Sequence, residues 1–441
     1  MPAAYRKPGA LQGIMLLLPM TMAVMGISVL TPVVPLLLAQ FKDAPHHEYL
    51  VIGGILTMPA IWVLLFSPVA GALADRWGRR NLLVAAMIVY ALVGIAPAFL
   101  DNLYAIIASR VAVGICESIV MTVSTTMISD YYVGHARERW LASQTAVASI
   151  SALGIIYLGG RFGAAYGWRG PFYLYVYSLP LALCVLAWIW EPARTLPAGE
   201  APGAATPGLA TPGLAAPGLA APGLAAPGAA APMAATPGAE DACYATFPRK
   251  RIIGICAITL IASISFYTVL TKNAEALYSL GVVSAAQIGK LTMLASIGVP
   301  LGTFAFWKLS RLPVGWLLCV DFAIVGGGFV LMGRAADPVS YAWSSFINQF
   351  GCGLVLPTML VWATRGLGYS IRGRVNGWWQ AAFAIGQFLS GMVVTLLSKQ
   401  LGGLLPAFSV MGDAMLVFAV VAAVAGVAWR RHAQPQPLGS S

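Results

Sequence analysis

Charged residues are scarce in this chain of 441 residues. Asp, Glu, Lys and Arg make up only 9% of it, and 59% of its residues are hydrophobic, whereas roughly a quarter of an ordinary soluble domain is charged. This composition excludes a soluble globular enzyme. The apolar residues form runs long enough for bilayer-crossing helices of about 20 residues, without the alternation that a transmembrane barrel needs. The sequence therefore predicts an all-α membrane protein.

Several signatures of soluble chemistry are also missing. The six Cys show no C-x-x-C spacing, so we predict no disulfide framework and no metal site. His46, His47 and Glu48 form one cluster of metal-ligand types, but they lie in an expected outer loop without a fourth ligand, which favours a solvated turn. No G-x-x-x-x-G-K loop is present, so we expect no cofactor and a proton gradient as the energy source. Basic runs with interleaved aromatics are absent, which argues against a nucleic-acid partner.

Twelve apolar runs are long enough to cross a membrane. They lie at about 11–38, 50–73, 82–100, 103–128, 139–160, 171–190, 250–272, 286–306, 313–333, 340–363, 375–396 and 405–429. Most of the 26 Lys and Arg fall in loops on the side of both termini, which the positive-inside rule assigns to the cytoplasm. The first run is too long for a signal peptide. We expect a multi-pass monomer in the lipid bilayer of a bacterial inner (plasma) membrane.

A proline-rich stretch divides the chain near its midpoint. Proline recurs every five residues from Pro202 to Pro237 among Ala, Gly, Leu and Thr, a composition that builds no core and is typical of a flexible tether. A partner-docking segment is the alternative. We divide the chain into a six-helix half at 1–193, a linker at 194–248, a second six-helix half at 249–432 and a tail at 433–441.

A charged, glycine-containing loop joins the second and third spans. Its defined positions are Gly71, Asp75, Arg76, Gly78, Arg79 and Arg80. The stretch resembles the G-x-L-a-D-r-x-G-r-r signature of the major facilitator superfamily. The resemblance implies two six-helix halves and a loop that latches them in one conformation, with Asp130, Arg139 and Glu191 at neighbouring helix ends. The alternative is that these charges act only as topology signals. In the second half, Phe306 replaces the aspartate, so any latch there is degenerate.

Three residues of the fourth span share one helix face. Arg110, Gly114 and Glu117 stand at i, i+4 and i+7, and ionisable groups at membrane depth normally face the bundle interior. Arg110 with Gly114 resembles the R-x-x-x-G element of drug and proton antiporters, although Val113 replaces its usual Gln. Glu117 is similar to the G-x-x-E pattern of spinster-like facilitators. We predict that Glu117 and Arg110 couple transport to protons; a static pair that holds the helix in place is the alternative.

Further polar residues complete the predicted site. Asp321, near the middle of the ninth span, is a second candidate proton carrier, or else a packing carboxylate. Lys272 and Glu275 are interpreted as an interfacial charge pair. With Gly114, the predicted substrate cavity includes the polar and aromatic residues Tyr157, Tyr267, Asn348, Gln349, Trp378, Trp379 and Gln380.

These features together predict a secondary transporter and not an enzyme. Proton-coupled export of a drug, metabolite or siderophore-like compound is the leading hypothesis. Gly159 and Gly160 match the end of the G-P-x-x-G-G motif of drug antiporters, but Ile155 and Ile156 replace its first Gly and Pro, so the direction stays open. Proton-coupled uptake of an organic anion is the alternative, with Arg110 and Lys272 as counter-ions. A membrane receptor or enzyme is disfavoured, because no nucleophile and base constellation is present.

Overall fold

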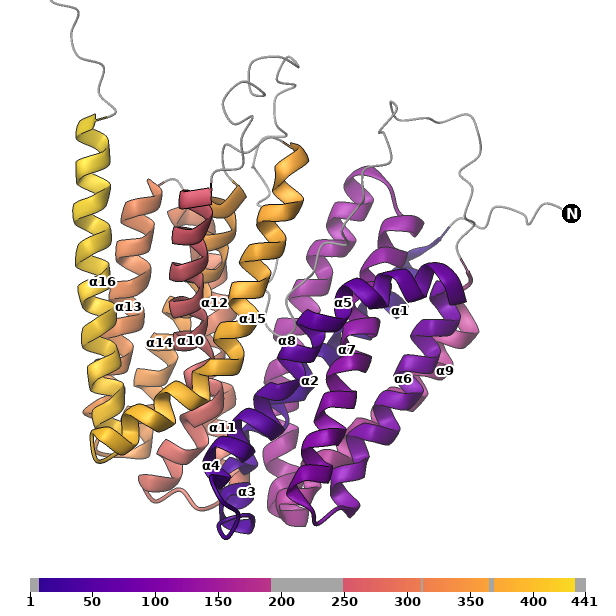
Figure 1. The fold of residues 1–441 in the computed structure, drawn as a ribbon, viewed down its shortest axis with the longest axis horizontal. Helices are drawn as coiled ribbons and strands as arrows, with labels where there is room; N and C mark the ends of the chain where they lie inside the picture. The colour runs from indigo at the N-terminus through magenta and orange to yellow at the C-terminus, as the bar shows by residue number, and fades with distance from the viewer. Residues whose placement is uncertain (1–7, 192–248, 311, 365–368, 433–441) are drawn as a thin grey trace, which may run out of the picture.

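The computed structural model describes residues 8–191, 249–310, 312–364 and 369–432. These residues form helices and turns, with no strand among them. Figure 1 shows two bundles side by side, the first coloured indigo to magenta and the second red to yellow. The predicted linker at 194–248 and tail at 433–441 lie outside the described residues.

The first half consists of six spans. In chain order they are α1 (Ala10–Leu17), α2 (Met20–Ser28), η1 (Thr31–Val33) and α3 (Val34–Gln40); α4 (His47–Tyr49), η2 (Leu50–Thr57) and α5 (Met58–Trp77); α6 (Arg79–Ile95) and η3 (Ala96–Phe99); α7 (Leu103–Tyr131); α8 (Gly134–Tyr166); and η4 (Gly167–Tyr177) with α9 (Ser178–Trp188). The chain reverses at Gly167, whose positive φ of 66° suits glycine.

The second half also consists of six spans. They are α10 (Arg249–Ser279), α11 (Ala285–Ser296) with α12 (Gly298–Leu309), α13 (Val314–Gly333), α14 (Pro338–Thr364), α15 (Tyr369–Gln400) and α16 (Leu404–His432). Ten described segments are long and apolar enough to cross a membrane; one of them contains both α8 and α9, and α14 is additional. The twelve-helix, all-α prediction is confirmed.

Several helices extend beyond the predicted spans. The fifth runs from Gly134 to Tyr166 and the eleventh from Tyr369 to Gln400, whereas the predictions were 139–160 and 375–396. Hydropathy marks the stretch that lies in hydrocarbon, but backbone hydrogen bonding continues through the charged residues at either end. The predicted positions of these two helices are therefore confirmed, but the predicted ranges were too short at both ends.

The first span is broken into short segments. Pro19 separates α1 from α2, and Pro32 and Pro35 lie in η1 and α3, where each removes a backbone donor. At the end of α2 the Leu30 amide donates to Ile27 O at 3.2 Å rather than four residues back. The break leaves the carbonyl of Gly26 available to a side chain.

The two halves touch near the end of the bundle opposite the start of α1 and the end of α16, called the outer end below. Thr57 Oγ1 donates to Phe388 O at 3.2 Å, and Lys399 Nζ lies 3.0 Å from a Glu48 oxygen. A Cβ on Gly160 would stand 2.6 Å from the Ala285 carbonyl oxygen, so α8 and α11 are nearly in backbone contact. Figure 1 shows the bundles converging at this end.

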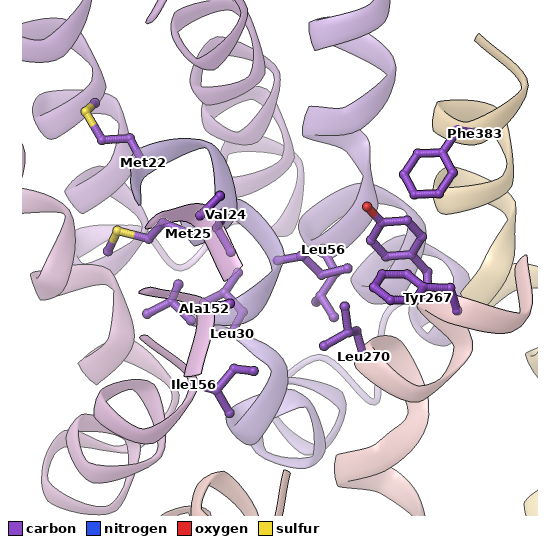
Figure 2. Packing of buried hydrophobic residues seen from close by; sticks show 14 of the residues in the cluster. Met22, Val24, Met25, Leu30, Leu56, Ala152, Ile156, Tyr267, Leu270 and Phe383 are labelled. Carbon is purple, nitrogen blue, oxygen red and sulfur yellow. The ribbon is translucent and has the colours of Figure 1, made fainter. Parts of the chain in front are cut away.

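One apolar cluster runs through both halves. Figure 2 shows Leu30 and Leu56 of the first half in one view with Tyr267 and Leu270 of the second, all members of that cluster. Burial of apolar side chains cannot favour one helix arrangement over another inside lipid, so close packing and polar contacts fix these positions. The contacts of the buried polar residues therefore define the candidate site.

Candidate functional site

Arg110 of α7 is fully buried and its three nitrogens all have acceptors. Nε donates to Ile55 O at 2.9 Å, Nη1 to Tyr175 OH at 2.6 Å and Nη2 to Gly26 O at 2.5 Å. Its guanidinium carbon also lies 5.5 Å from the Tyr175 ring centre. A single cation thus joins α2, η2 and η4 to α7.

Two of these acceptors are carbonyls at helix irregularities. Gly26 O has no donor four residues on, because Leu30 turns to Ile27. The residue four after Ile55 is Pro59, which has no N–H to donate. A carbonyl left unpaired in hydrocarbon costs several kcal/mol in principle. Arg110 is thus a clamp that satisfies the breaks in the first two spans.

Glu117 lies two turns further along α7 and is 2% exposed. The Tyr90 hydroxyl of α6 lies 3.5 Å from Glu117 Oε1 and 2.9 Å from Met22 O, and the backbone amide of Gly26 faces the carboxylate. The approach is close enough that a Cβ on residue 26 would stand 2.7 Å from Oε1. Glu117 therefore sits in a polar site shared by α2, α6 and α7.

Two tyrosines complete this network. The rings of Tyr90 and Tyr175 lie 5.1 Å apart, and both are fully buried. Because Tyr175 also accepts a hydrogen bond from Arg110, it joins the arginine to the Tyr90 and Glu117 end of the network. We define the Glu117 network as Gly26, Tyr90, Arg110, Glu117 and Tyr175, all of the first half.

Sequence reasoning placed Arg110 and Glu117 on one face but did not identify Gly26, Tyr90 or Tyr175. These three lie on other helices, and only packing brings them to α7. One local signal was available, since Pro59 four residues after Ile55 marks a carbonyl that needs a side-chain donor. Gly114, predicted in the cavity, packs α7 onto α5: a Cβ there would stand 2.6 Å from Pro59 O.

The charged loop after α5 is held together by contacts within the first half. Gly78 has φ 86°, which suits glycine, and it precedes α6. Glu191 accepts hydrogen bonds from the backbone amides of Arg79 at 2.7 Å and Arg80 at 2.8 Å. This carboxylate caps the positive N-terminal end of α6.

Ion pairs extend the same cluster to two more helices. The Arg79 guanidinium pairs with Asp75, at 3.5 Å, and with Asp130, and Arg80 donates to the Leu186 carbonyl. Arg76 and Arg139 have exposed side chains, and Gly71 lies within α5. The structure thus brings together six of the predicted latch residues, namely Asp75, Gly78, Arg79, Arg80, Asp130 and Glu191.

The second half also contains a buried carboxylate in a helix interior, Asp321 of α13. It is fully buried, and neither of its oxygens has a hydrogen-bond partner among the described residues. Thr358 lies beside it but donates its hydroxyl hydrogen to Leu354 O at 2.9 Å. Phe306, at the position of the missing loop aspartate, packs with Leu317 and Leu354 in a small apolar cluster.

The predicted cavity residues have different surroundings. Tyr157 and Trp378 are 39% and 60% exposed, whereas Tyr267 is fully buried and packs edge-on to Phe383 at 5.6 Å. Asn348 Nδ2 donates to Val325 O at 2.9 Å, within the second half. Side-chain atoms without partners among the described residues belong to three of the others, namely Gln349, Trp379 and Gln380.

A separate polar group lies in α10 toward the outer end. Lys272 is 1% exposed and its Nζ lies 2.6 Å from Glu275 Oε2. Asn273 donates to Thr292 Oγ1 of α11 at 2.7 Å. The predicted Lys272 and Glu275 pair is thus present, and the cation is inside the bundle.

The fold and this site define a multi-pass helical membrane protein of two six-helix halves, with a buried ionisable network in the first. The family model of the Major Facilitator Superfamily matches residues 16–391. This chain belongs to that superfamily.

Individual relatives are more distant. The chain is 27% identical to the 4-hydroxybenzoate transporter PcaK of Pseudomonas putida over 33% of each chain. It is 27% identical to the class B tetracycline resistance protein of Escherichia coli over 39% of this chain and 42% of that one. The matches thus span less than half of these relatives. These relatives are a transporter and a resistance protein and not enzymes, which agrees with the prediction that this chain is not an enzyme.

Solved structures match over nearly the whole chain. A bacterial homolog of the human lysosomal transporter Spinster, inward-facing and unoccupied, superposes with a TM-score of 0.68 at 16% identity, over 97% of this chain and 99% of that one. The D323A mutant of the nucleoside transporter NupG gives 0.68 at 13% identity, over 95% and 99%. Identities this low show the fold alone.

Proposed function

We propose that this protein is a secondary transporter that moves a small solute across a bacterial inner membrane by alternating access, as a monomer. The observation that supports this proposal is the set of contacts between the halves at the outer end. These contacts, which close that end, are Thr57 with Phe388, Glu48 with Lys399, and the near-contact of Gly160 with Ala285. Transport then requires these contacts to break while the cytoplasmic ends meet. The charged loop around Arg79 and Glu191 is proposed as the latch between the two conformations.

Proton coupling is the second part of the proposal, and Glu117 is its leading carrier. The carboxyl is buried in the membrane domain but contacts a hydroxyl, an amide and a neighbouring arginine network, so the surrounding groups can respond to its charge. Ionisable residues inside membrane bundles commonly serve as proton relays. Asp321 is the second candidate carrier.

The expected direction is export of a drug, metabolite or siderophore-like compound. The similarity to a tetracycline resistance protein supports this direction. Uptake of an organic anion is the second candidate, favoured by the buried cation of Lys272 and by the similarity to a 4-hydroxybenzoate transporter. Glu275 already neutralises Lys272, so an anion would have to compete with this carboxylate.

A transport assay in proteoliposomes tests the proposal. The protein is reconstituted with an imposed pH gradient of either sign, and uptake is measured for a panel that includes 4-hydroxybenzoate and tetracycline, the compounds in the names of the two relatives described above. Accumulation that needs the gradient and is lost in Glu117→Gln supports proton coupling. Accumulation that a protonophore leaves unchanged contradicts it. The sign of the effective gradient decides between export and uptake.

A further inference from the structure

Glu117 and Tyr90 approach the two ends of a single helical hydrogen bond in α2. In an α-helix each amide donates to the carbonyl four residues back, so Gly26 N–H and Met22 O form one backbone link of α2. The Tyr90 hydroxyl donates to Met22 O at 2.9 Å. The Glu117 carboxylate faces the Gly26 amide. The Glu117 carboxylate can therefore compete with Met22 O for the Gly26 amide, while the Tyr90 hydroxyl shares the Met22 carbonyl at the other end of the link.

This link lies within one turn of the C-terminal end of α2, which ends at Ser28. Arg110 holds Gly26 O at 2.5 Å, and Leu30 donates to Ile27 instead of Gly26. After the Met22 and Gly26 link, the Val29 amide still donates to Met25 O at 3.3 Å, so less than one helical turn follows the link before the break. A change in one hydrogen bond here can alter where α2 ends, which a change in mid-helix would not do.

The hydrogen-bond inventory changes with one proton. An ionised Glu117 only accepts, and it can take the amide hydrogen of Gly26 and the hydroxyl hydrogen of Tyr90, which is 3.5 Å away. When a proton binds to the carboxylate, a new O–H bond forms and the group becomes a donor as well. The Tyr90 hydrogen then remains on Met22 O, and the Gly26 amide returns to the same carbonyl.

The titratable and charged groups facing Glu117 come from three elements. Tyr90 reaches it from α6, Tyr175 and Tyr177 from η4, and Arg110 and Cys116 belong to its own helix. The cation is held by two carbonyls and a hydroxyl, so it stays in place as the carboxyl gains or loses a proton. The amide of Gly26 and the hydroxyl of Tyr90 are the groups free to change partners.

We propose that Gly26 and Tyr90 are positioning residues that transmit the charge of Glu117 to the shape of α2. The ionised carboxylate draws the Gly26 amide away from Met22 and loosens the end of α2, and proton binding restores the helix. Because α2 packs on α8 and touches α10 of the second half, this change reaches the contact between the halves. The inference rests on the proposed proton coupling at Glu117.

Hydrogen exchange of the full-length protein in lipid nanodiscs, measured by mass spectrometry without substrate, tests this. Exchange of peptides covering α2 is compared at pH 5.5 and 9 as protection factors, which removes the intrinsic pH dependence. We expect wild-type α2 to be about fivefold less protected at the higher pH, the effect of one lost hydrogen bond of typical strength. Glu117→Gln is expected to remove the difference.

Three further variants sharpen the test. In Gly26→Ala the new Cβ displaces the carboxylate from the amide, so α2 becomes insensitive to pH; Tyr90→Phe keeps the response but reduces it. Gly154→Ala in α8 is the matched control, because a Cβ there meets nothing within 4 Å, and it should behave as wild type. If Gly26→Ala does not fold, Glu117→Gln and Tyr90→Phe still decide the outcome.

The results separate the inference from the proposed function. An α2 response that is absent in wild type, or unchanged in Glu117→Gln, overturns the inference. If Glu117→Gln abolishes gradient-driven accumulation while wild-type α2 shows no response, Glu117 couples protons by another route and only the inference fails. If α2 responds through Glu117 but Glu117→Gln still accumulates solute, the link to α2 stands and the coupling proposal fails.

Discussion

Among the described residues, the two carboxylates buried in helix interiors have different surroundings. Glu117, in the first half, contacts a tyrosine hydroxyl and a backbone amide beside the bound arginine. Asp321, in the second half, has no hydrogen-bond partner among the described residues. If Glu117 carries the proton as proposed, its protonation changes hydrogen bonds to neighbouring helices, whereas protonation of Asp321 would change few of them. The proposed coupling site thus differs from Asp321 in its connections to other helices and not in its burial.

The largest expected effect on stability comes from removing Arg110, the clamp of the first half. Arg110→Ala leaves the Gly26 and Ile55 carbonyls without a donor and removes the cation nearest Glu117. We expect the free energy of unfolding to fall by about 3–5 kcal/mol, the usual cost of removing one partner from a buried charged network. Denaturant unfolding of the purified protein in detergent measures it.

The second half supplies the control. Asp321→Asn changes a carboxylate whose oxygens have no hydrogen-bond partner among the described residues, so the free energy of unfolding of this variant should stay within about 1 kcal/mol of the wild-type value or rise. Equal losses in Arg110→Ala and Asp321→Asn would show that the two halves depend on their buried charges alike, contrary to the comparison above.

A smaller effect is expected at the capped end of α6. Glu191→Gln weakens the hydrogen bonds to the Arg79 and Arg80 amides, at a cost of about 1 kcal/mol. In the second half, α13 begins without a side-chain cap, and Ser310→Ala nearby is the matched control with no expected loss. The same unfolding experiment compares them. Glu191→Gln should also slow transport, since the latch loses one of its carboxylates; wild-type turnover would contradict the latch.

The sequence predicted the parts of this comparison that are local in the chain. The loop residues Asp75 to Arg80 follow one another, and Arg110 and Glu117 share a face by helical spacing alone. Their partners could not be predicted, because Tyr90 and Tyr175 reach Glu117 and Arg110 through the packing of three helices. The lack of hydrogen-bond partners for Asp321 among the described residues could not be predicted either. A sequence does not show that the Thr358 hydroxyl donates to Leu354 O instead of to the carboxylate.

A smaller effect, on the balance between conformations, is expected from the ion pair of Lys399 with Glu48 at the outer end. Lys399 and Glu48 are both partly exposed, and such pairs contribute about 0–1 kcal/mol and are screened by salt. Lys399→Gln should shift the protein modestly toward the outward-open state, measured as faster labelling of a cysteine placed at Ile52. High salt should mimic the variant in wild type. Identical labelling in both proteins would mean that the ion pair does not help to close this end.

The smallest expected effect is on the N-terminal caps of α7 and α14, which are the fourth spans of the first and second half. Asn102 accepts from the Tyr104 amide at 2.8 Å at the start of α7, and Asp337 accepts from the Val339 amide at 2.9 Å at the start of α14. Hydrogen bonds from Ser340 lower the pKa of Asp337 below its usual value.

Because one cap is an aspartate and the other an asparagine, only the start of α14 is expected to respond to acid. A lowered pKa means that Asp337 stabilises α14 at neutral pH and that this stabilisation is lost as the pH falls through the folded-state pKa. Asn102 does not titrate. Hydrogen exchange should therefore show loss of protection at the start of α14 but not of α7 in acid, and Asp337→Asn should make the two ends alike. Acid fraying of both ends in wild type would exclude this cause.

The central claim is that the first half carries the proton. Gradient-driven accumulation in proteoliposomes tests it most directly, with wild type, Glu117→Gln and Asp321→Asn compared for the panel solute that wild type accumulates. The account predicts that Glu117→Gln binds the solute but no longer accumulates it, while Asp321→Asn retains accumulation. If Glu117→Gln accumulates solute with unchanged pH dependence and Asp321→Asn does not, the proton site lies in the second half and the account is wrong.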